Sequence, residues 1–118
     1  LKKKKLMISL EINKVSKKIK KNLNKKVGIC YDTGNLGKDS FKFLKKNYNQ
    51  INHIHIKDIN KMKKKNTFLG KGYIDLKKIS KFLIKKKYFY ALTLETFFRK
   101  NKKMVDAVTN LKTLKSLL

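Results

Sequence analysis

Residues 51–58, with the sequence INHIHIKD, alternate apolar and polar side chains. This period of two is typical of a β-strand and not of a helix. The isoleucines at positions 54 and 56 fall on one side of the predicted strand. Both histidines of the chain, His53 and His55, fall on the other side together with Lys57, and Asp58 stands where the strand should end. The segment therefore predicts a strand with one apolar face and one face rich in chemically active groups.

Three further segments repeat this two-sided pattern, and segments of helical period lie between them. The sequence predicts strands over residues 6–11, 27–32, 51–58 and 88–95. It predicts helices over residues 13–25, 40–48, 75–87 and 103–118, with Asp39 or Ser40 and then Asp75 as N-caps. Residues 59–74 are expected to form a long connection.

Strands that alternate with helices indicate a parallel sheet with right-handed crossovers. In each predicted strand one side is large and aliphatic, whereas the other is small or polar and ends in a carboxylate. A doubly wound sheet would be apolar on both faces, whereas a barrel interior can become polar at its carboxyl mouth. Four of the seven acidic residues stand at these strand ends, namely Glu11, Asp32, Asp58 and Glu95.

The expected fold class is therefore α/β, with parallel (β/α) units that form half of a (β/α)8 barrel. A full barrel needs about 250 residues, and residues 1–118 supply roughly half of one. Because the first residue is Leu and not Met, we expect the chain to be a fragment of something longer.

The net charge of +26 would ordinarily suggest an anionic partner. Arg99 is the only arginine among 33 basic residues, however, and the lysines are spread along the chain. Proteins that read DNA or RNA usually depend on arginine for bidentate contacts. We therefore interpret the charge as a compositional bias and expect no nucleic-acid partner.

The single cysteine, Cys30, excludes an intramolecular disulfide and favours a reducing, cytoplasmic location. It is expected to be a small core residue. No uncharged apolar run approaches the roughly 18 residues of a membrane span, so no membrane partner is expected.

If the four strands are neighbours in a barrel, Glu11, Asp32, His55 and Glu95 converge at its mouth. Three carboxylates and one imidazole suit a divalent cation of intermediate hardness, such as Mn²⁺, Mg²⁺ or Co²⁺, and Zn²⁺ is also compatible.

Nearly the whole chain resembles the last four βα units of the xylose isomerase-like sugar phosphate isomerase/epimerase superfamily of TIM barrels. The segments that carry the resemblance are LMISLE, VGICYDTGN, NHIHIKD, LGKGYIDL and YALTLE. The branch that they resemble most is hexulose phosphate isomerase-like. The resemblance implies a C-terminal half barrel whose metal ligands are Glu11, Asp32, His55 and Glu95, with the second histidine of HIHIKD preferred over the first.

The resemblance also implies an activity, namely the isomerisation or epimerisation of a small sugar or sugar phosphate. Glu11 and Glu95 would move a proton at the carbon next to the carbonyl while the metal polarises the ketose oxygens. Asn35 and Lys57 would contact the substrate, and Asp58 would either contact it or support the residues around the metal.

Two alternatives remain open at this point. One is an endonuclease IV-like phosphodiesterase on the same barrel, although residues 59–74 lack the histidine that such a multi-zinc site carries. The other is a non-catalytic half-barrel remnant, whose open sheet edge would favour a homodimer.

For individual side chains, His53 is expected to be a hydrogen-bonded residue of the barrel interior, and Asp106 is expected to lie on the surface of the last helix.

Overall fold

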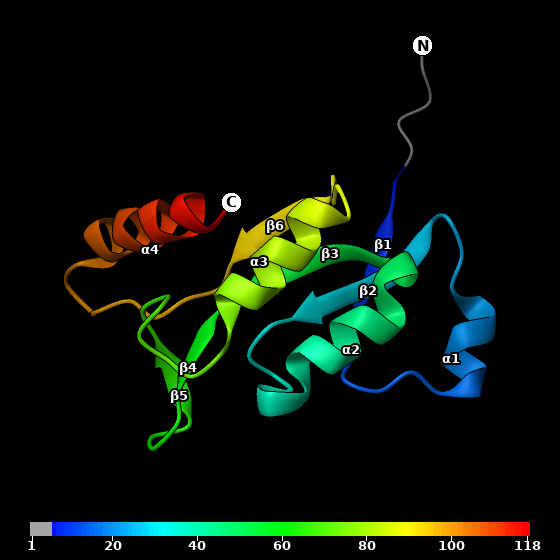
Figure 1. Cartoon of the computed structure of the whole chain (residues 1–118), viewed down its shortest axis with the longest axis horizontal. Coiled ribbons are helices and arrows are strands. Elements are labelled where there is room, and N and C mark those ends of the chain that lie inside the picture. The colour runs from blue at the N-terminus through cyan, green and yellow to red at the C-terminus, as the bar shows by residue number, and fades with distance from the viewer. Residues whose placement is uncertain (1–5) are drawn as a thin grey trace, which may run out of the picture.

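The computed structural model of the chain describes residues 6–118, and its centre is a four-stranded parallel sheet (Figure 1). The strands lie in the order β1 (Ile8–Glu11), β2 (Val27–Asp32), β3 (Ile51–Ile56) and β6 (Ala91–Leu94). The four helices are α1 (Lys17–Asn22), α2 (Ser40–Asn47), α3 (Leu76–Lys85) and α4 (Lys103–Leu117). Helices α2 and α3 cover one and the same face of the sheet. The predicted α/β class with parallel strands is confirmed.

Several elements are shorter than predicted, and one was not predicted. Helix α1 has only six residues, because the Ser16 side chain caps it and Leu23 ends it in an extended conformation. The connection after β3 contains an antiparallel hairpin of β4 (Asp58–Asn60) and β5 (Lys65–Thr67). This hairpin escaped prediction because its lysine-rich sequence has no apolar alternation. Two short 3₁₀ turns, Gly37–Asp39 and Tyr48–Gln50, flank α2.

The core lies between the sheet and the helices, as the aliphatic sides of β2 and β3 predict, whereas Ile8 and Leu10 of β1 are exposed. Ile29 and Tyr31 of β2 and Ile54 of β3 are completely buried there. The Tyr31 hydroxyl lies 2.5 Å from the hydroxyl of Ser40, the first residue of α2, which in turn donates a hydrogen bond to the carbonyl of Thr33. These contacts fix α2 against the carboxyl end of β2, where the polar strand ends gather.

A β-bulge in the middle of the sheet sets the direction of the histidines. The register between β2 and β3 shifts, so that Ile29 faces Ile51 and the next residue, Cys30, faces His53. The extra residue is Asn52, whose amide accepts a hydrogen bond from the Ser9 hydroxyl at 2.7 Å. A bulge of one residue reverses the alternation. Ile51 therefore stays in the core, while the histidines face away from the helices.

The last helix, α4, is rotated about its axis relative to the orientation that its apolar residues predict. Asp106 and Asn110 are buried in α4 together with Leu114. Most of the apolar residues of the helix are instead exposed, namely Met104, Val105, Val108 and Leu111. The expectation that Asp106 lies on the surface is therefore wrong.

Polar contacts explain this rotation of α4. The Asp106 carboxylate accepts hydrogen bonds from the backbone N–H of Arg99 and from its guanidinium, both at 2.7 Å. These bonds lower the pKa of Asp106. The Asn110 side chain accepts from the backbone N–H of Leu69 at 2.9 Å. Buried polar groups need such partners, and here their positions outweigh the apolar stripe.

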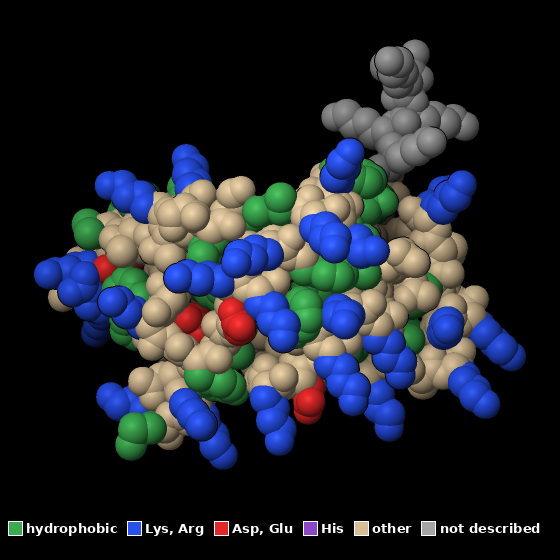
Figure 2. All heavy atoms as spheres, in the orientation of Figure 1, with side chains coloured by type: hydrophobic (Ala, Val, Ile, Leu, Met, Phe, Trp, Pro, Cys, Tyr) green, Lys and Arg blue, Asp and Glu red, His purple; other side chains and the backbone are tan. Residues whose placement is uncertain are grey.

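Lysine side chains project separately over the whole helix-covered face, with few carboxylates between them (Figure 2). They do not gather into one basic stripe on this face. Among the described residues, no helix is both long enough and apolar enough to cross a membrane.

Candidate metal centre

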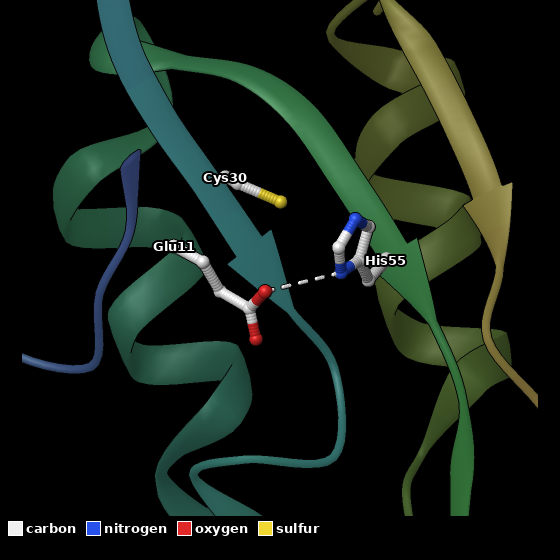
Figure 3. A group of neighbouring side chains, drawn as sticks. All are labelled: Glu11, Cys30 and His55. Carbon is white, nitrogen blue, oxygen red and sulfur yellow. Dashed lines mark ion pairs between the residues drawn. The ribbon is translucent and has the colours of Figure 1, made fainter. Parts of the chain in front are cut away.

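The carboxyl ends of the four parallel strands bring together the predicted ligands. Glu11 ends β1 and Asp32 ends β2, His55 lies near the end of β3, and Glu95 directly follows β6. Figure 3 shows Glu11 and His55 on the face of the sheet that α2 and α3 do not cover, with Cys30 beside them. The parallel topology accounts for this meeting, because all carboxyl ends lie along one edge.

Three carboxylates surround one imidazole nitrogen. His55 Nδ1 lies 2.9 Å from Glu95 Oε2, 3.5 Å from Glu11 Oε2 and 4.0 Å from Asp32 Oδ2. Asp32, His55 and Glu95 offer ligand atoms that all lie within 4.8 Å of one another, and Glu11, Cys30 and His55 form a second such group. The two groups share His55, which stands at the centre of the arrangement.

Two buried atoms of this centre have no well-aligned hydrogen bond among the described residues, namely Asp32 Oδ2 and His55 Nδ1. The other carboxylate oxygen of Asp32 is occupied, because it accepts from the backbone N–H groups of Gly34 and Asn35 at 2.8 and 2.9 Å. Buried polar atoms without hydrogen bonds are rare in folded proteins and call for an explanation.

The separations between the ligand atoms fit a divalent cation. Bonds of about 2.1 Å to six ligands would place those ligands roughly 3.0 to 4.2 Å apart. The distances of 2.9, 3.5 and 4.0 Å from His55 Nδ1 fall in or next to this range. Carboxylate and imidazole donors also suit Mn²⁺, Mg²⁺, Co²⁺ and Zn²⁺. The residues present therefore fit such an ion.

The ammonium group of Lys57 lies among these carboxylates, 2.7 Å from Asp32 Oδ2 and 3.3 Å from Glu95 Oε1. Burial acts to lower the pKa of Lys57, but its bond to Asp32 and the charges of both carboxylates outweigh it, and the pKa is raised. Thr33 fixes the backbone of Lys57 by two hydrogen bonds, of 2.7 and 2.9 Å. The sequence predicts that Lys57 contacts the substrate. In the structure its ammonium group points to the carboxylates of Asp32 and Glu95.

Asn35 lies at the exposed mouth beside Glu11. Its side-chain amide donates to Glu11 Oε1 at 3.0 Å, which leaves Glu11 Oε2 directed at His55. Its predicted role as a substrate contact is compatible with this position.

Asp58 lies apart from the centre, and of the two roles expected of it, its burial opposes direct contact with substrate. The side chain is completely buried. Its carboxylate accepts from four backbone N–H groups at 2.9 to 3.1 Å, those of Ile59, Gly70, Gly72 and Ile74. No space is left beside it, because a Cβ at Gly72 would lie 2.0 Å from Asp58 Oδ1. Asp58 therefore organises the loop that precedes α3.

His53 precedes His55 by two residues in β3 and therefore lies further from the carboxyl edge of the sheet. Its Nε2 is 2.7 Å from the hydroxyl of Thr93, and its ring meets that of His55 edge to face at 5.1 Å. This agrees with the expectation of a hydrogen-bonded interior residue.

Cys30 is the member of the cluster that sequence reasoning assigned to the core alone. It is 3% exposed, as expected, but it faces Glu11 and His55. The alternation of β2, which places Cys30 on the same side as Asp32, is the signal that could have found it. Burial, followed by the charges of Glu11, Asp32 and Glu95, raises the pKa of the thiol to about 11.

We expect Cys30 to react slowly with iodoacetamide. At pH 8 a thiol with a pKa of about 11 is roughly one part in a thousand thiolate, which is the reactive form. Alkylation of the folded protein in the presence of a chelator should be more than 100-fold slower than in urea, and should accelerate about tenfold per pH unit between pH 7.5 and 9.5. A rate that levels off near pH 9 would contradict the raised pKa. Mass spectrometry measures these rates.

A parallel (β/α) sheet with carboxylates and an imidazole converging at its carboxyl edge is the arrangement found at the mouth of TIM barrels. Residues 11–117 match the family model described as xylose isomerase-like TIM barrel, and the chain belongs to this family. The family is mostly enzymatic, with isomerase, epimerase and endonuclease members, and often binds divalent metals. A comparison with curated proteins gives no match.

Proposed function

We propose that the protein is a metal-dependent isomerase or epimerase of a small sugar or sugar phosphate. The observation that carries this proposal is the convergence of three carboxylates on His55 Nδ1, which lies 2.9 Å from Glu95, 3.5 Å from Glu11 and 4.0 Å from Asp32. Glu11, Asp32, His55 and Glu95 would hold the cation. When a divalent cation is bound there, the chemistry that it supplies is polarisation of the ketose oxygens, which lowers the cost of the developing negative charge.

The two glutamates are placed to move the proton. Glu11 and Glu95 come from the outer strands β1 and β6 and approach His55 from either side. Their side chains are 45% and 47% exposed, so that a ligand at the mouth can reach both of them. One carboxylate would take a proton from the carbon next to the carbonyl, and the other would return one. Asn35 orients Glu11, and Lys57 orients Glu95.

The endonuclease-like alternative finds less support. The segment after β3 forms the β4–β5 hairpin and contains no histidine, so it offers no further imidazole to a multi-zinc site. The lysines of the face shown in Figure 2 do not form one continuous stripe. We therefore retain the proposal of a sugar substrate and of no nucleic-acid partner.

We also propose that the chain supplies the C-terminal half of a (β/α)8 barrel. Within the described residues, β1 and β6 each pair with a strand on one side only. Open edges of this kind accept further strands. A second half barrel, including that of another copy of this chain, would cover them, and the mass in solution distinguishes a homodimer from a monomer.

Exchange of substrate hydrogen with solvent tests the proposed activity. With Mn²⁺ and a panel of ketoses and ketose phosphates in D₂O, we expect deuterium to enter at the carbon next to the carbonyl, as observed by NMR. The change Glu95→Gln should slow this exchange at least 100-fold, because a proton-transfer group contributes roughly 10²–10⁴ in rate. The matched control is Asp39→Asn, an exposed carboxylate that makes no capping hydrogen bond. Equal rates in Glu95→Gln and the unaltered protein would exclude the proposed role.

A further inference from the structure

We propose that the centre contains a second cation position, formed by Glu11, Cys30 and His55, which selects cations that bind sulfur, such as Zn²⁺ and Co²⁺, over Mg²⁺ and Mn²⁺. This inference rests on the metal-binding part of the proposed function and adds a thiolate ligand to it. A carboxylate oxygen, the sulfur and an imidazole nitrogen of these residues all lie within 4.8 Å of one another. Figure 3 shows the three side chains converging from neighbouring strands.

The pairing of the strands explains why the thiol lies here. Glu11 and Cys30 are register partners in the parallel pair β1–β2, so their side chains lie side by side on one face of the sheet. On its other side Cys30 pairs with His53, two residues before His55. The thiol therefore lies one step further from the carboxyl edge than the imidazole of His55, on the same face.

The separations suit a tetrahedral ion. Zn²⁺ binds sulfur at about 2.3 Å and nitrogen or oxygen at about 2.0–2.2 Å, which places neighbouring ligand atoms roughly 3.3 to 3.7 Å apart. Glu11 Oε2 and His55 Nδ1 are already 3.5 Å apart. The sulfur of Cys30 lies within 4.8 Å of both partners, so a small adjustment of these side chains completes the set. Three protein ligands leave a fourth position for water, as in catalytic zinc sites.

The charges around the centre give an independent reason to separate this position from the remaining ligands. The Lys57 ammonium lies 2.7 Å from Asp32 and 3.3 Å from Glu95. Within residues 6–118, no ion pair joins a lysine to Glu11. A cation on the Glu11 side therefore meets a carboxylate that no ammonium group neutralises, whereas a cation on the Asp32 side meets Lys57.

The thiol determines which cations this position prefers. The side chains of Glu11 and His55 are 45% and 21% exposed, whereas Cys30 is 3% exposed, so an entering cation contacts the carboxylate and the imidazole before the sulfur. When the metal–sulfur bond forms, the S–H bond breaks and its proton is released to solvent. Thiolate sulfur favours Zn²⁺, whereas Mg²⁺ and Mn²⁺ favour oxygen ligands. Cys30 is thus the residue that distinguishes these two classes of metal.

The test uses the whole chain and Co²⁺, because a cobalt–thiolate bond absorbs strongly in the near ultraviolet. We expect this band to appear during a titration with Co²⁺. The change Cys30→Ser should abolish it and raise the Kd for Co²⁺ at least tenfold, the lower limit of what a weakened metal site loses. The Kd of this variant for Mn²⁺ should change less than threefold.

The matched control is Asp32→Asn, which keeps the thiol and alters a ligand on the other side of the centre. We expect this variant to weaken the binding of Mn²⁺ but to retain the near-ultraviolet band with Co²⁺. X-ray absorption of the unaltered protein loaded with Zn²⁺ requires no variant, and it should show a sulfur neighbour at about 2.3 Å besides the lighter atoms.

Three outcomes would overturn the inference. They are a saturated Co²⁺ complex without the band, a zinc spectrum with oxygen and nitrogen neighbours alone, and equal losses of Co²⁺ and Mn²⁺ affinity in Cys30→Ser. Calorimetry with Mn²⁺ and the deuterium exchange keep the two proposals separate. If Mn²⁺ binds and the ketose exchanges hydrogen without any sulfur signal, only this inference fails. If the sulfur signal appears and no ketose exchanges hydrogen, the proposed function fails and the thiolate position stands.

Discussion

Replacing His55 with alanine is expected to weaken the binding of Mn²⁺ by at least 100-fold in a calorimetric titration. His55 Nδ1 lies within 4.0 Å of an oxygen of each of the three carboxylates, so its loss removes the ligand that both groups share. Removing a residue that only hydrogen-bonds to a metal ligand typically lowers the metal affinity 10- to 100-fold. Removing the ligand itself should lower the affinity at least as much.

The chain provides a matched control in His53→Ala. His53 has the same chemistry on the same strand, but its Nε2 is directed to Thr93. We expect the Kd for Mn²⁺ in this variant to stay within threefold of the unaltered value. Asp32→Asn should resemble His55→Ala, because it removes the charge of a buried oxygen while an amide oxygen still accepts from Gly34 and Asn35. Equal losses in His53→Ala and His55→Ala would contradict the assignment of the ligands.

Replacing Asp58 with alanine is expected to lower the free energy of unfolding by about 3 to 5 kcal/mol. Four backbone N–H groups lose their acceptor at once, including those of Gly70 and Gly72. Each buried donor left without a partner costs about 1–3 kcal/mol, although solvent that enters the opened loop restores part of this. Urea denaturation followed by circular dichroism measures the change.

The control for this experiment is Asp75→Ala, which removes an exposed N-cap carboxylate whose one capping bond goes to Lys78. Such caps are worth about 1 kcal/mol. If Asp58→Ala unfolds at the same urea concentration as the unaltered protein and affects only turnover, the side chain contacts substrate after all, and the structural role assigned to it is wrong.

The sequence was sufficient to predict that carboxylates meet at one edge of the sheet, because two simple rules determine this. Side chains two apart share a face of a strand, and parallel strands end along one edge. Glu11, Asp32 and Glu95 could therefore be brought together from strand ends, whereas the choice of His55 over His53 came from the resemblance to the family. The first rule covers only regular strands, and the bulge at Asn52 breaks it.

The residues that were wrongly assigned depend on contacts between segments. Asp58 follows the HIHIK run and could be taken for a site residue, but its partners lie more than ten positions further along the chain at Gly70 and Gly72. Asp106 could be taken for a surface residue until Arg99 is seen to bind it from the preceding loop. The pattern of polar and apolar residues along the sequence does not indicate such hydrogen bonds between distant segments. The hairpin was missed for a related reason, since its strands are stabilised by backbone pairing and not by apolar alternation.

The side chain of Lys57 has a consequence for the metal-free protein. Its ammonium stands between Asp32 and Glu95 as a tethered counterion, and it offsets part of the mutual repulsion among the three acidic groups. This lysine thus holds the carboxylates close together, and a cation that bound there would have to displace a charge that the chain itself carries. The affinity of the proposed site for a cation would then be the difference between two electrostatic arrangements, and Lys57 would set how readily the ion is released.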